Sequence, residues 1–194
     1  YTRYRSFEGP TGHRDSPHRS MPKDLRSFIA ELDATSPEDV ARVTKPVSPR
    51  YEMSAILTHL EKRKRFPLLF FKNPKNGQAP VVINAQASRR LMSIALECKP
   101  EDLARAFSER QSKPLAPVEM INAPVHEISR TGEEIDLNEV PLLTHYDVNV
   151  APYITAGIVV AVDPDTGVRN TSYNRLMMAG NRELRIFMAV GRHL

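Results

Sequence analysis

The sequence predicts an α+β protein in which a small domain of mixed helices and strands precedes a segment made only of strands. Three observations support this class. Up to residue 112, apolar residues recur at helical spacing in some stretches and form short runs between turn residues in others. From Lys113 to Pro152 the chain is rich in proline. Beyond Tyr153, long apolar β-type segments alternate with turn sequences.

The first 20 residues have no apolar periodicity and carry four arginines among histidine, serine, glycine and proline. A segment of this composition buries too little apolar surface to offset the entropy lost on ordering. We therefore expect residues 1–20 to be a disordered basic tail, and residues 21–115 to form an N-terminal α/β domain.

Four stretches of this domain have helix signals. Apolar side chains recur at i, i+3, i+4 and i+7 over residues 25–32, and at similar spacing over residues 53–60. Ser88 is a suitable N-cap for a helix through residues 91–96, and Pro100 suits the first turn of another.

Two short runs have the length of buried strands. Residues 67–71 and 80–83 are apolar and are bracketed by proline, asparagine and glycine, with an Asn-Gly turn at 76–77 between them. Residues 40–43 form only a short apolar stretch.

A linker is predicted over residues 113–152, because its apolar runs are brief and its prolines remove backbone donors. We expect it to contribute an edge strand or two, from residues 118–121 and 140–143. The domain boundary is placed near residue 115.

The part of the chain beyond Tyr153 predicts a meander of three strands, over residues 154–162, 168–178 and 184–190. Asp163-Pro-Asp-Thr-Gly167 is typical of a hairpin turn, and Gly180-Asn181 of a second turn. Three strands with open apolar edges are barely sufficient as an independent fold, so we expect the sheet to continue into further chain.

Composition narrows the function classes. The formal net charge is +4, but half of this excess lies in the tail, and the run Lys62–Arg65 has no aromatic stacking platform beside it. We therefore expect no nucleic-acid partner. No window approaches the roughly 18 apolar residues needed to span a bilayer. A single cysteine, Cys98, cannot form an intrachain disulfide, which favours a reducing, cytoplasmic setting.

The common catalytic motifs are absent from the sequence: it contains no phosphate loop, no Gly-x-Gly-x-x-Gly, no nucleophile elbow and no His-Glu-x-x-His. His59 is predicted to lie on a helix surface, and His126 and His145 to have structural or solvated roles in the linker.

An unusual polar run interrupts the predicted second strand of the meander. Residues 170–175 read Asn-Thr-Ser-Tyr-Asn-Arg between apolar flanks. Polar groups on both faces of an interior strand cost free energy unless a partner satisfies them. Two interpretations fit: a bound polyanion or cofactor, or an edge strand with one face in water.

Thr155 lies 15 residues before Asn170, Arg175 lies five after it, and His193 lies 23 after it. This order and spacing of motifs resembles that of the UbiD family of reversible, non-oxidative decarboxylases. The similarity extends over residues 21–194. It implies that residues 116–194 are the first part of a split β-barrel that binds a flavin, and that the cofactor is prenylated FMN with Mn²⁺ (or Mg²⁺) and K⁺.

The resemblance also implies roles for individual residues near the metals. Asn170 and His193 match two protein ligands of the divalent metal, which also binds the cofactor phosphate. Thr171 falls where a backbone carbonyl helps to hold K⁺. Amide, imidazole and phosphate ligands suit Mn²⁺ or Mg²⁺ better than a thiophilic metal.

Further positions match cofactor and substrate contacts. Thr155 and Ser172 correspond to residues that contact the flavin, with Ser172 beside its phosphate. Arg192 stands where some members have glutamine, also at the phosphate end. Arg175 matches the catalytic arginine, which orients the substrate carboxylate and contacts the cofactor. The third metal ligand and the catalytic glutamates of the family would lie beyond residue 194.

Asn170 and Arg175 are five residues apart, which is about 17 Å along an extended strand. They can therefore line two ends of a long ligand but cannot share one small ion. Because their parity is opposite, their side chains should point to opposite faces, so we predict a twist or a bulge between them.

The resemblance implies reversible decarboxylation of an aromatic or α,β-unsaturated carboxylic acid. The partners it implies are a small-molecule acid, a flavin prenyltransferase that supplies the cofactor, and further copies of the same chain in a homo-oligomer. Two alternatives stay open. One is a non-catalytic module that binds a flavin or nucleotide phosphate, and the other is a basic RNA-associated protein.

Overall fold

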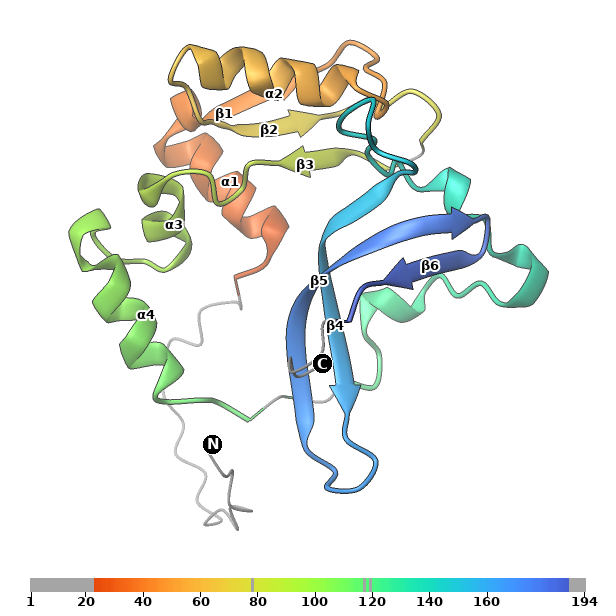
Figure 1. Cartoon of the computed structure of the whole chain (residues 1–194). Helices are drawn as coiled ribbons and strands as arrows, with labels where there is room; N and C mark the ends of the chain where they lie inside the picture. The colour runs from red at the N-terminus through yellow and green to blue at the C-terminus, as the bar shows by residue number, and fades with distance from the viewer. Residues whose placement is uncertain (1–22, 78, 117, 119, 189–194) are drawn as a thin grey trace.

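The computed structural model describes residues 23–188 except 78, 117 and 119 (Figure 1). The predicted tail, residues 1–20, lies outside the described residues. Within the described part, an N-terminal sheet with its helices is joined by a long connection to a C-terminal sheet.

The N-terminal sheet contains three strands in the order β1-β2-β3 among the described residues. β1 and β2 run parallel, and β2 and β3 antiparallel. In chain order the elements are α1 (Leu25–Thr35), β1 (Val40–Val43), α2 (Glu52–Lys62), β2 (Leu68–Phe71), β3 (Val81–Ile83), α3 (Arg89–Ala95) and α4 (Leu103–Gln111). The four predicted helices and both predicted strands are confirmed, and the short apolar stretch at 40–43 proves to be a strand.

The helix starts follow local chemistry. α1 begins at a capping box, in which Asp24 Oδ1 accepts a hydrogen bond from Ser27 N at 2.7 Å and Ser27 Oγ accepts one from Asp24 N at 2.8 Å. Ser88 caps α3, as predicted, by accepting a hydrogen bond from Leu91 N at 3.1 Å.

Helices cover both faces of this sheet, with α2 on one side and α1 and α3 on the other (Figure 1). Successive residues of β2 point to opposite faces, so Leu68 packs in one cluster and Leu69 in the other. The first cluster contains Phe28, Ile29, Leu32, Leu68 and Leu91. The second contains Val47, Met53, Leu69, Phe71 and Val81.

The connection over residues 113–152 forms no strand among its described residues, so the predicted edge strand at 140–143 is wrong. Only isolated bridges occur there: Leu143 pairs with Tyr153, and Thr144 with Arg50. Pro141 has no N–H to donate to a ladder, and a short 3-10 helix, η5 (Leu137–Glu139), ends just before it. The other predicted run, 118–121, includes residue 119, which lies outside the described residues.

The C-terminal sheet is the predicted antiparallel meander of β4 (Tyr153–Val162), β5 (Arg169–Gly180) and β6 (Glu183–Ile186). Its first turn is fixed by Asp163, whose Oδ1 accepts hydrogen bonds from Asp165 N at 2.8 Å and Thr166 N at 3.1 Å. Gly167 follows with a φ of +68°, which favours glycine.

The two sheets are joined through the segment at Leu143 and Thr144. Tyr51 N donates to Thr144 O at 2.9 Å, and Tyr153 N donates to Leu143 O at 2.9 Å. The connection therefore fixes the start of β4 against the start of α2.

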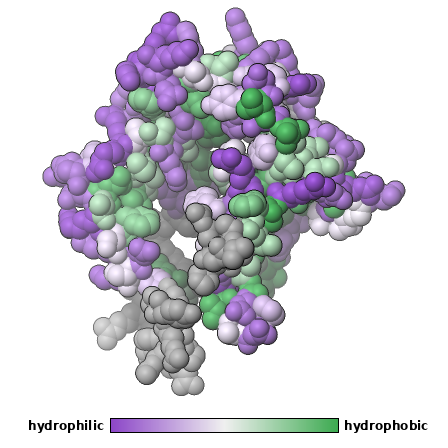
Figure 2. Space-filling view, viewed as in Figure 1, coloured by the Kyte–Doolittle hydropathy of each residue, from purple (hydrophilic) through white to green (hydrophobic). Residues whose placement is uncertain are grey.

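One face of β4 presents exposed apolar side chains. Ile158, Val160 and Val162 alternate along the strand and are each more than half exposed. Figure 2 shows hydrophobic surface over the C-terminal sheet. In the described residues, no helix is both long and apolar enough to cross a membrane.

Candidate functional site

The polar run of β5 is divided between the two faces of the strand. Asn170, Ser172 and Asn174 are half-buried on one face, which we call the amide face. Thr171 and Arg175 alternate with them and are exposed on the opposite face. The structure therefore brings together two of the predicted residues, Asn170 and Ser172, and separates both from Arg175.

Two side chains of the amide face contact each other directly. Asn174 Nδ2 donates a hydrogen bond to Ser172 Oγ at 2.7 Å, and the same nitrogen lies 3.5 Å from the Ser172 carbonyl oxygen. The partners of Asn170, Ser172 and Asn174 on β4 are Ala161, Val159 and Gly157. None of these three carries a polar side chain, so β4 offers no competing partner.

A β-bulge lies beside Arg175, in β4 and not in β5. Ile154 pairs with Leu176 and Gly157 pairs with Asn174, so Thr155 and Ala156 together oppose Arg175. The predicted twist or bulge between Asn170 and Arg175 is therefore wrong in its location: the register of β5 runs evenly from Asn170 to Asn174, the extra residue is in β4, and Asn170 and Arg175 stay on opposite faces. Thr155 and Arg175, both predicted cofactor contacts, lie opposite each other at this bulge.

Gly157 has a steric role next to the bulge. A Cβ atom at this position would lie 2.9 Å from Asn174 O and 2.9 Å from Leu176 Cδ1. Contacts this short force a shift of the strand, so the close approach of β4 to β5 requires glycine here.

His145 is an additional residue near the site, for which the sequence predicted only a structural or solvated role. Its Nδ1 lies 2.9 Å from Ser54 Oγ of α2, 91 residues away in the chain. Its Nε2 is buried and has no hydrogen-bond partner among the described residues. Burial lowers the pKa of His145, and the positive charge of Arg175 lowers it further. Both effects favour the neutral form of this imidazole.

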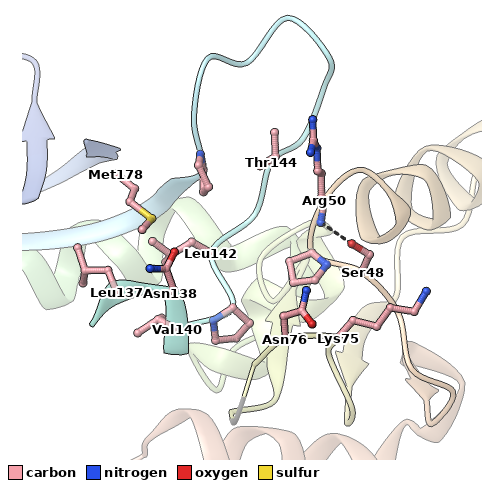
Figure 3. Close-up of a pocket in the computed structure, with 13 residues that line it drawn as sticks. Ser48, Arg50, Lys75, Asn76, Leu137, Asn138, Val140, Leu142, Thr144 and Met178 are labelled. Carbon is pink, nitrogen blue, oxygen red and sulfur yellow. Dashed lines mark hydrogen bonds between the residues drawn. The ribbon is translucent and has the colours of Figure 1, made fainter. Parts of the chain in front are cut away.

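The structure has two hollows near His145 and the start of β4. One, of about 440 Å³, lies between α2 and the segment that carries His145. The other, of about 190 Å³, is lined by residues from two loops of the N-terminal domain, from the connection and from β5, among them Arg50, Thr144 and Met178 (Figure 3). Met178 is eight residues beyond Asn170, about 27 Å along an extended strand, so this second hollow is remote from Asn170.

The described residues supply only part of the predicted metal site. Across residues 23–188, with the three gaps noted, no group of three or more His, Cys, Asp or Glu side chains could hold a metal ion. His193 and Arg192 lie outside the described residues. Asn170 offers a hard amide oxygen and Ser172 a hydroxyl two residues away on the same face, which fits the phosphate-and-metal end of a flavin site.

Two family models match consecutive parts of the chain. The 3-octaprenyl-4-hydroxybenzoate carboxy-lyase N-terminal domain matches residues 33–111, and the Rift-related domain of the same carboxy-lyase matches residues 117–194. The chain belongs to the UbiD family. The UbiD models thus cover both sheets and all of the predicted site residues.

Two relatives are similar to most of this chain. The anhydromevalonate phosphate decarboxylase of Methanothermobacter thermautotrophicus is 32% identical over 170 residues, which cover 88% of this chain and 37% of that protein. A protein encoded in the cooM 5′ region of Rhodospirillum rubrum is 31% identical over 175 residues, covering 88% of this chain and 36% of its own length.

Solved structures show the same fold. The UbiD-class enzyme HmfF from Pelotomaculum thermopropionicum has a TM-score of 0.75 and 32% identity, both in an evolved dimeric form with prFMN and in a complex with FMN. These alignments cover 86% and 87% of this chain. The chain spans 38% and 37% of the HmfF chains, so it corresponds to a little over a third of such an enzyme.

Proposed function

We propose that the protein containing this chain catalyses the reversible, non-oxidative decarboxylation of an aromatic or α,β-unsaturated carboxylic acid with prenylated FMN. The observation that carries this proposal is the match of both UbiD family models, in order, over segments that include the β4–β5 hairpin with its polar run. The solved HmfF complexes with prFMN and FMN support a flavin cofactor.

At one end of the hairpin, Asn170 and Ser172 would hold the metal-bound phosphate of the cofactor. In this proposal Asn170 and His193 would hold Mn²⁺ or Mg²⁺ through an amide oxygen and an imidazole nitrogen, and the Thr171 carbonyl would hold K⁺. Arg192 would contact the phosphate end. The half-buried position of Asn170 and Ser172 on one face of β5 supports this arrangement.

At the other end, Arg175 would bind the substrate carboxylate. Its side chain is exposed, and none of the ion pairs among the described residues involves it, so its guanidinium is free to form a bidentate pair. Thr155, opposite Arg175 at the bulge, would contact the flavin. When bound, the prenylated flavin supplies the electron sink for loss of carbon dioxide, which amino-acid side chains lack.

The exposed apolar face of β4 supports the proposal that β4, β5 and β6 belong to a split β-barrel. Ile158, Val160 and Val162 would be covered once further strands close the sheet. We also propose a domain boundary near residue 115, from the change in composition there, and a cytoplasmic setting, from the single cysteine. From the resemblance we propose a homo-oligomer and a flavin prenyltransferase as the supplier of the cofactor.

The test is to express the complete coding sequence with a flavin prenyltransferase, record the ultraviolet-visible spectrum of the purified protein, and screen aryl and acrylic acids for release of carbon dioxide. We expect a bound modified flavin and turnover of at least one acid. Arg175→Ala should retain the flavin and lose turnover, because it removes the carboxylate partner. A flavin-loaded protein that never releases carbon dioxide would instead support a non-catalytic binding module.

A further inference from the structure

We propose that Asn174 is a positioning residue that fixes the Ser172 hydroxyl as a hydrogen-bond donor toward the flavin phosphate. This inference rests on the proposed function, because it concerns the phosphate end of the same site. Its starting point is the contact of 2.7 Å between Asn174 Nδ2 and Ser172 Oγ.

The orientation of the Asn174 amide follows from its surroundings. Its nitrogen lies 2.7 Å from Ser172 Oγ and 3.5 Å from the Ser172 carbonyl oxygen. If the amide were turned around, its oxygen would face the carbonyl oxygen, which cannot donate a hydrogen bond. The amide therefore donates to Ser172.

This donation decides what the serine hydroxyl can do. A hydroxyl has one proton and two lone pairs, so Ser172 Oγ uses one lone pair for Asn174 and keeps its proton for another partner. No hydrogen bond in the described part of the chain has Ser172 Oγ as its donor. Its partner across the sheet, Val159, has no acceptor in its side chain.

An anionic oxygen is the partner that this geometry favours. Asn170 lies on the same face, two residues or about 7 Å along the strand, so a metal at Asn170 and a phosphate at Ser172 would be neighbours. A hydroxyl donor to a phosphate makes a charge-assisted hydrogen bond, which is stronger than a neutral one. Asn174 thus acts on the phosphate through Ser172 and does not touch it.

The test compares FMN with riboflavin, which lacks the phosphate. Both flavins are titrated by fluorescence quenching, with Mn²⁺ present, against the protein expressed from its complete coding sequence. The variants are Asn174→Val, Ser172→Ala and the double variant. Valine removes the amide donor but keeps a residue that suits a strand.

We expect Ser172→Ala to lower the preference for FMN over riboflavin about tenfold, because a hydrogen bond to a charged group is lost. Asn174→Val should lower it about fivefold, with riboflavin binding unchanged. The double variant should be no worse than Ser172→Ala alone, because Asn174 acts only through the serine. Asn174→Asp should lower FMN binding most, since its carboxylate accepts the Ser172 proton and repels the phosphate.

The inference is overturned if Asn174→Val keeps the wild-type preference for FMN, if its effect adds fully to that of Ser172→Ala, or if it weakens riboflavin binding equally. These outcomes leave the proposed function intact as long as the wild type prefers FMN. A wild-type protein with no preference for FMN over riboflavin overturns both.

Discussion

Replacing Gly157 by alanine tests whether the close packing of β4 against β5 is as tight as the structure indicates. The added Cβ would lie 2.9 Å from the backbone oxygen of Asn174 and 2.9 Å from Leu176 Cδ1. The leucine methyl group can rotate away, but Asn174 O belongs to a paired strand and cannot move alone. The steric clash with Asn174 O can therefore be relieved only by a shift of the backbone, which costs free energy of folding.

The magnitude follows from two opposing terms. Forcing an extra methyl group into a packed site costs about 1–3 kcal/mol. Replacing glycine by alanine restricts the unfolded chain and returns about 0.4–1 kcal/mol. We expect a net destabilisation of about 1–2 kcal/mol, which corresponds to a Tm lower by roughly 2–8 °C for a domain of this size.

Gly180→Ala is the matched control, because a Cβ atom at Gly180 has no neighbour within 4 Å and its φ is not left-handed. This variant should be neutral or slightly stabilised. Thermal unfolding followed by far-ultraviolet circular dichroism gives the Tm, and hydrogen exchange of peptides from β4 and β5 locates the change. Equal stability of the two variants would refute the steric argument.

Three further changes probe other parts of the molecule. Lowering the pH from 7 to 5 should reduce the Tm more in the wild type than in His145→Gln. Burial and the charge of Arg175 lower the pKa of His145 in the folded protein. Below a pH of about 6.5 the unfolded chain therefore binds a proton at this histidine more readily than the folded protein does, and the free energy of unfolding falls. Ser88→Ala should destabilise the N-terminal sheet and its helices by about 1 kcal/mol in urea unfolding, because the cap on Leu91 N is lost. Asn170→Ala should abolish Mn²⁺-dependent flavin retention in the complete protein, measured by the flavin absorbance after gel filtration.

Each of these predictions has a result that contradicts it. Parallel pH profiles for the wild type and His145→Gln would show that His145 titrates normally. A Ser88→Ala variant with the wild-type urea midpoint would mean that water replaces the cap without cost. Normal flavin content in Asn170→Ala at low Mn²⁺ would remove this residue from the metal site.

The site itself was predictable in part. The polar run 170–175 could be found in the sequence because it interrupts an apolar strand that follows a turn with a strong local signal, whereas the resemblance to the UbiD family was needed to single out Thr155. The location of the bulge could not, since it depends on which residues of β4 face Arg175. The contact between His145 and Ser54 joins residues 91 positions apart and has no local signal.

Local signals were sufficient to predict the stripe over residues 25–32 that becomes α1, the Ser88 cap of α3 and the turn at Asp163. The folded chain was needed to establish that residues 40–43 pair with β2, that residues 140–143 do not form a strand, and that Asn174 contacts Ser172. The two groups differ in the sequence range of the interactions that cause them. Caps, periodicity and turn chemistry act within a few residues, whereas strand pairing and side-chain contacts depend on segments brought together only when the chain has folded.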